Sequence, residues 1–248
     1  MERTDPEGPQ GLAVSADGYT LVPSSVEVTP GTPSAFTFKV TGKDGKPVKS
    51  YTALHDKELH LVVVRRDLTG YQHLHPTRAA SGTWSVPLGV ASAGVYKAFA
   101  NFQPAGQAMP MPMTLAVDLM ASGHFTAAAL PKPAVTATVE GFMVALTGEV
   151  LVGGSKLTFA VSRAGKPVDL QPYLGAFGHL VALRVGDLAY LHVHPEGAPG
   201  HEHHPPAGGR ITFVAPVPTA GQYRLFLDFK AADVVRTAEF TVVAPRAK

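Results

Sequence analysis

The chain has 248 residues, with 21 basic and 19 acidic side chains and a formal net charge of +2 at pH 7. No basic stripe interleaved with aromatic residues occurs, which argues against nucleic acid as a partner, and no apolar run approaches the ~20 residues of a membrane-spanning helix. Cysteine is absent, so disulfides, thiolate metal sites and cysteine nucleophiles are excluded.

The first segment, residues 1–17, is polar and rich in Pro and Gly, and we expect it to be flexible. It contains no hydrophobic stretch that would serve as a signal peptide. After it, apolar residues alternate with polar ones along Phe36, Phe38 and Val40. Short alternating segments recur every 10–12 residues with Gly, Pro or Asp between them. Period-2 alternation predicts strands, and no window predicts an amphipathic helix.

Two long segments repeat each other without a gap. Residues 59–76 read LHLVVVRRDLTGYQHLHP, and residues 178–195 read GHLVALRVGDLAYLHVHP. A second pair follows in the same order, with AGVYKAFANF at 93–102 and AGQYRLFLDF at 220–229. Repeats of this length indicate two diverged domains rather than a solenoid.

The boundary between the copies is expected near residues 127–134, a Pro-rich stretch of small residues. This places the first domain at 18–128 and the second at 134–245. The strand pattern predicts an all-β chain of two tandem immunoglobulin-like or cupredoxin-like antiparallel β-sandwich domains.

Three histidines recur at the same spacing in both copies: His60, His73 and His75 in the first, and His179, His192 and His194 in the second. Alternation along a strand puts the two histidines of each H-x-H on one face. In the second copy, a tight turn at Gly186 and Asp187 that pairs Val185 with Leu188 would set His179 opposite His194. The gapless alignment predicts the same arrangement in the first copy, with His60 opposite His75. Three imidazoles that converge in this way suit copper, zinc or nickel.

Further candidate ligands are expected at the same end of each sandwich. They are His55 before the first histidine strand, Met109, Met111 and Met113 in the MPMPM loop, and His201, His203 and His204 in the GHEHHPP loop. Thioether sulfur favours Cu(I). Asp56, Glu58 and Glu202 are expected as direct ligands or as acceptors for imidazole N–H groups.

The segments HDKELHLVVVRRDLTGYQHLHP at 55–76, GTW at 82–84 and YLGAFGHLVALRVGDLAYLHVHP at 173–195 carry a resemblance to a known group. They resemble actinobacterial secreted or membrane-anchored proteins with tandem YtkA-like (FixH-like) domains. The resemblance implies a cell-envelope location and a role in handling heavy metals, chiefly copper. Leu174 stands in the second copy where the first has His55, so the two sites are expected to differ.

The histidine pattern therefore predicts a non-enzymatic copper-binding protein that acts as a chaperone, scavenger or buffer and binds Cu(I) or Cu(II). The resemblance implies that it works outside the cytoplasm. Its partners would be metal ions and a copper-transfer protein, and no segment of the chain would span a membrane. Two alternatives stay open: a zinc-dependent hydrolytic or hydratase enzyme that uses the open three-histidine site, and a structural or interaction module in which the histidines are incidental.

Overall fold

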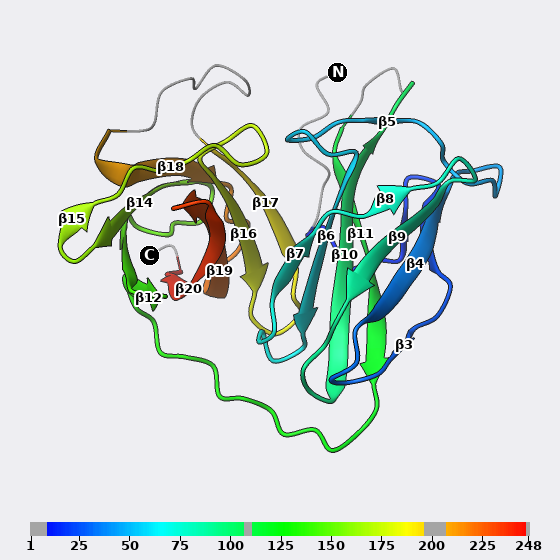
Figure 1. The fold of residues 1–248 in the computed structure, drawn as a ribbon, viewed down its shortest axis with the longest axis horizontal. Helices are drawn as coiled ribbons and strands as arrows, with labels where there is room; N and C mark the ends of the chain where they lie inside the picture. Colours follow the sequence, from blue (N-terminus) through cyan, green and yellow to red (C-terminus); the bar gives the residue numbers. More distant parts are fainter. Residues whose placement is uncertain (1–8, 107–110, 196–206, 247–248) are drawn as a thin grey trace. The chain divides into compact units, whose positions relative to one another are not determined.

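A computed structural model describes residues 9–106, 111–195 and 207–246 of the chain (Figure 1). The chain divides into two compact units, residues 1–130 and 131–248. Within the described ranges the only helical element is the three-residue 3-10 turn η1 (Ala207–Gly209), and everything else regular is β-structure. The expected all-β chain of two tandem, immunoglobulin-like sandwich domains is confirmed.

The first domain consists of two sheets. The five-stranded sheet has the order β1 (Ser15–Ala16), β2 (Tyr19–Pro23), β4 (Ser34–Thr41), β9 (Thr83–Leu88) and β8 (Thr77–Arg78). The six-stranded sheet has the order β3 (Glu27–Val28), β11 (Met113–Ala121), β10 (Gly94–Pro104), β6 (Leu59–Arg65) and β7 (Gln72–Leu74), with β5 (Tyr51–Thr52) paired to β10.

Alternate residues of both sheets meet in the core of this domain. On β4 the buried positions are Phe36, Phe38 and Val40, as the period of two predicts. From the other sheet, Leu59 and Leu61 of β6 join the same cluster. Their neighbour His60 therefore projects from the opposite face of its sheet, away from the core.

The second domain forms one continuous nine-stranded sheet that wraps around its own core. Its order is β12 (Thr136–Val139), β13 (Phe142–Thr147), β14 (Ser155–Arg163), β18 (Arg210–Ala215), β17 (Tyr190–Pro195), β16 (Gly178–Arg184), β19 (Gly221–Ala231) and β20 (Val234–Ala244), with β15 (Lys166–Pro167) paired to β14.

The two domains differ where the histidine strand passes from one half of the sandwich to the other. In the second domain β17 runs unbroken to Pro195 and pairs with both β16 and β18. In the first domain β7 ends at Leu74 and β8 begins at Thr77, each in a different sheet. His75 thus lies in the two-residue crossing between the sheets of the first domain.

Candidate metal centre

The register of β6 and β7 sets the three histidines of the first domain beside one another. Val62 pairs with His73 and Leu61 with Leu74, so the next position, His60, lies opposite His75. This is the register that the sequence predicts. Residues directly opposite in an antiparallel pair project from the same face, so all three imidazoles share the face that points away from the core.

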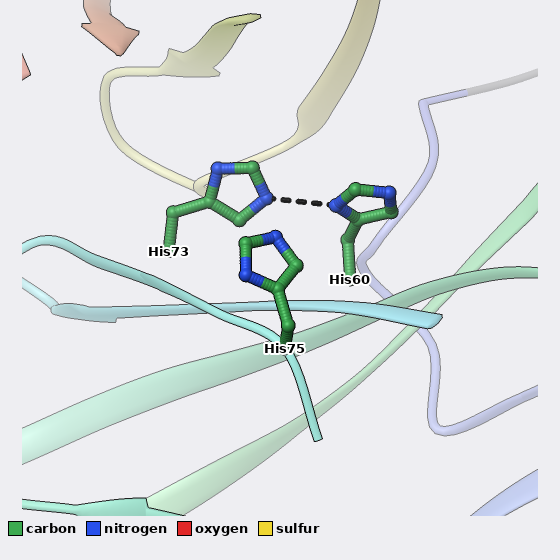
Figure 2. Close-up of side chains that lie close together, drawn as sticks. All are labelled: His60, His73 and His75. Carbon is green, nitrogen blue, oxygen red and sulfur yellow. Dashed lines mark hydrogen bonds between the residues drawn. The ribbon is translucent and has the colours of Figure 1, made fainter. Parts of the chain in front are cut away.

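The three imidazoles converge on one point (Figure 2). One donor nitrogen from each ring lies within 4.8 Å of the other two. The ring centroids are 5.2 Å apart for His60 and His73, 5.1 Å for His60 and His75, and 4.8 Å for His73 and His75. Metal–nitrogen bonds of ~2.0–2.1 Å in a tetrahedral site put the donors ~3.4 Å apart. The donors would therefore have to approach one another by up to about 1.4 Å to hold one ion.

A backbone carbonyl fixes which nitrogen of His60 faces the cluster. Nε2 of His60 lies 2.8 Å from the carbonyl oxygen of Leu54, while Nδ1 lies 3.0 Å from Nε2 of His73. A carbonyl only accepts, so neutral His60 carries its proton on Nε2 and presents the lone pair of Nδ1 to the other histidines. A metal-binding histidine usually donates the N–H of its other ring nitrogen to such an acceptor.

The carbonyl of Leu54 belongs to a two-residue turn. Leu54 and Lys57 exchange both backbone hydrogen bonds, at 2.8 and 3.1 Å. The residues between them, His55 and Asp56, have φ values of +47° and +61°, the pair of left-handed conformations typical of a type I′ turn. The turn positions the acceptor of His60.

His55 lies next to the three-histidine group without belonging to it. Its ring centroid is 6.3 Å from that of His60, in an edge-to-face arrangement. The turn that carries it also supplies the Leu54 carbonyl, so His55 flanks the group from the His60 side.

Glu58, an expected ligand or acceptor, is engaged elsewhere. Its two carboxylate oxygens accept hydrogen bonds from Arg78 at 2.9 and 3.0 Å. The Arg78 guanidinium in turn lies over the rings of Tyr51 and Trp84. Burial raises the pKa of Tyr51 to about 12, against the opposing effects of the Trp84 N–H and of Arg78. Tyr51 therefore stays a neutral phenol at neutral pH.

Among the expected methionine ligands, Met113 is not brought to this group. Met113 pairs with Phe102 and packs against the core, on the face of the sheet opposite to His60, which corrects the expectation that it would lie beside the histidines. The reason is strand alternation, since its neighbour Thr114 is the residue on the histidine side. Met111 is 46% exposed. Met109, His201, His203 and His204 lie outside the described residues.

The second domain repeats the backbone arrangement. Leu180 pairs with Val193 and Val181 with His192, so His179 lies opposite His194, as predicted. The predicted tight turn is wrong in detail: the backbones of Arg184 and Ala189 are hydrogen-bonded and enclose a four-residue loop, but the register is the same. The side chains of His192 and His194 lie outside the described part of the structure.

The support of His179 also repeats that of His60. Nε2 of His179 lies 2.8 Å from the carbonyl oxygen of Tyr173, six residues earlier. Tyr173 and Ala176 exchange both backbone hydrogen bonds around a turn in which Leu174 and Gly175 have positive φ. The two domains therefore share the histidine, the carbonyl that supports it and the turn that holds the carbonyl.

A family model described as a domain of unknown function, DUF8832, matches residues 14–118 and 137–246. The chain belongs to the DUF8832 family. The two matched segments correspond to the two sandwich domains, so the internal repeat is a repeat of the DUF8832 domain. The resemblance to YtkA-like domains remains a prediction.

No curated protein matches the DUF8832 chain. Among solved structures it is similar to the Escherichia coli adhesin FdeC (14% identity, 94% of this chain and 66% of that chain, TM-score 0.30). It is also similar to invasin, a bacterial integrin-binding protein (15%, 92% and 39%, TM-score 0.25), and to InvD of Yersinia pseudotuberculosis (14%, 93% and 58%, TM-score 0.27). The chain spans less than two thirds of each of these structures, and TM-scores this low establish no shared function.

Two residues beside the candidate ligands were missed by sequence reasoning. Asn101 pairs with His60 across β6 and β10, and Asp228 pairs with His179 across β16 and β19. All four of these side chains are buried. The DUF8832 repeat aligns Asn101 with Asp228 through the segments ANF and LDF, but only the strand pairing shows that they lie beside the histidines.

Proposed function

We propose that this protein binds copper ions through one three-histidine site in each domain and acts as a metal chaperone, scavenger or buffer outside the cytoplasm. The observation that carries the proposal is the convergence of His60, His73 and His75, whose donor nitrogens lie within 4.8 Å of one another. Imidazole nitrogen suits copper and zinc, and three donors on one face leave a further coordination position open to a transferred ligand.

The proton positions of His60 support the proposal. Its Nε2–H donates to the Leu54 carbonyl, and its Nδ1 faces His73 at 3.0 Å. An ion that binds both Nδ1 of His60 and Nε2 of His73 would replace the hydrogen bond between them. A ring held by a backbone acceptor loses little conformational freedom on binding, which favours affinity.

The repetition of this arrangement supports two sites rather than one. His179 has the same acceptor at the same separation in the chain, and the register of β16 and β17 matches that of β6 and β7. An incidental surface histidine would not require the second domain to repeat the supporting turn.

The location outside the cytoplasm rests on the sequence resemblance to YtkA-like envelope proteins. Within the ranges that the structure describes, it contains no helix that could span a bilayer. The same resemblance favours a binding role over catalysis.

The test is metal stoichiometry of the full chain, purified without a histidine tag. We expect about two copper ions per chain, and about one in the variant His73→Ala/His75→Ala. His124→Ala is the matched control, because His124 is exposed and is not one of the grouped histidines. A double variant that binds as much copper as the wild type would overturn the assignment.

A further inference from the structure

Each candidate site continues into a row of polar side chains across the neighbouring strands. In the first domain His60 pairs with Asn101, and Asn101 pairs with Thr114. In the second domain His179 pairs with Asp228, and Asp228 pairs with Thr237. The two rows match position by position and differ by one charge.

In both rows the central residue is hydrogen-bonded to the threonine, but the direction of the bond differs. The Nδ2 of Asn101 donates to Thr114 Oγ1 at 3.0 Å and to the Met113 carbonyl at 3.3 Å. The Oδ1 of Asp228 accepts from Thr237 Oγ1 at 2.6 Å. Asn101 and Asp228 are each only 2% exposed, so both sit well away from solvent. An amide and a carboxylate of nearly equal shape thus occupy equivalent places.

Asp228 lies directly beside His179 on the neighbouring strand, and both side chains are buried. Side chains paired directly across strands have Cβ atoms about 5 Å apart, so an ion bound to His179 would lie within the field of this carboxylate.

We propose that Asp228 makes the site of the second domain more selective for divalent cations over Cu⁺ than the site of the first domain, where Asn101 takes its place. The inference rests on the proposed metal-binding function. A dication gains twice the attraction of a monocation from the same fixed charge, and a buried position weakens that attraction far less than bulk water does.

The test uses the full chain with one site removed at a time. The variant His73→Ala/His75→Ala keeps the second site, and His192→Ala/His194→Ala keeps the first. Affinities for Zn²⁺ and Cu⁺ are measured by competition with chelators of known affinity. In the His73→Ala/His75→Ala variant, which keeps only the second site, Asp228→Asn should weaken Zn²⁺ binding roughly 10- to 100-fold. This is the usual effect of losing a residue that supports metal ligands. Cu⁺ binding should weaken by only about the square root of that factor, because the energy scales with the charge.

The reciprocal change is Asn101→Asp in the His192→Ala/His194→Ala variant, which keeps only the first site. It should strengthen Zn²⁺ binding more than Cu⁺ binding. Asp169→Asn, an exposed carboxylate of the second domain, is the control and should change neither affinity. Asp228→Asn introduces the residue that the first domain already tolerates, so the fold should persist, and the Asn101→Asp arm stands independently of it. Equal changes for both ions, or none in either arm, would overturn the inference while leaving metal binding intact. A parent variant that binds neither ion would instead overturn the proposed function in that domain, and the inference with it.

Discussion

The carbonyl oxygen of Leu54 accepts a hydrogen bond from Nε2 of His60 at 2.8 Å while it also accepts one from the backbone N–H of Lys57 at 3.1 Å. The imidazole is therefore held from behind by a turn that is itself closed by two backbone bonds. The pairing of Tyr173 with His179 repeats the arrangement in the second domain. Each ring is oriented by the apo fold, before an ion arrives.

This relationship predicts that His60 stabilises the first domain without any metal. We expect His60→Ala to lower the free energy of unfolding by about 2 kcal/mol, because it removes a buried side chain and one hydrogen bond to a buried carbonyl. His75→Ala should cost less, since His75 is less buried than His60. Urea unfolding read by tryptophan fluorescence measures this, because Trp84 is the only tryptophan and lies in the core of the first domain. An equal or larger loss in His75→Ala would contradict the expectation.

Metal binding should raise the stability of the same domain. At a free Zn²⁺ concentration 100 times Kd, the expected gain is about 2.7 kcal/mol, since the ion binds the folded site and not the unfolded chain. The Trp84 signal should move to higher urea in the wild type and in His124→Ala, and should stay in place in His73→Ala/His75→Ala. If Zn²⁺ does not change the urea midpoint of the wild type, the histidines do not form a Zn²⁺ site.

The acid stability of the first domain should depend on Asp67. Burial alone would raise the pKa of this carboxyl, but hydrogen bonds from Arg65, the Ala128 N–H and Thr69 outweigh burial and lower the pKa to about 2. The folded-state pKa lies below the unfolded value of 3.8, so the unfolded chain binds more protons between these pH values. The stabilisation, about 2 kcal/mol, is present above about pH 4 and is lost as the pH falls toward 2.

Asp67→Asn should therefore destabilise the first domain at pH 7 and flatten the acid limb of its stability curve between pH 4 and 2. The measurement is urea unfolding by Trp84 fluorescence across this range. Asp44→Asn is the control, because the Asp44 side chain is 62% exposed and its only ion pair, within the described residues, is a surface contact with Lys46 at 3.9 Å. An acid limb as steep in Asp67→Asn as in the wild type would show that other carboxylates set it.

The histidine register was predictable because it depends on local rules. Strand alternation fixes the shared face of His73 and His75, and a short connection fixes which residue of the next strand lies opposite them. The loop predicted for the second domain was two residues too short, but the register did not change. The observed loop, closed by Arg184 and Ala189, leaves His179 opposite His194 as predicted. Met113 was wrongly expected beside the histidines because it follows the MPMPM loop directly. Its position next to the loop does not show which face of β11 its side chain occupies.

By itself the sequence determined the all-β class, the two repeated domains and the pairing of His60 with His75, because these follow from period-2 alternation and from self-similarity. Only the tertiary structure decided what surrounds the histidines: the Leu54 carbonyl behind His60, and Asn101 or Asp228 from a strand about 40 to 50 residues further along. The Leu54 carbonyl is placed by a turn that precedes the His60 strand. Asn101 and Asp228 are placed by strands β10 and β19, which pair with the histidine strands β6 and β16. No local pattern encodes which residue of a distant strand will lie beside a given imidazole.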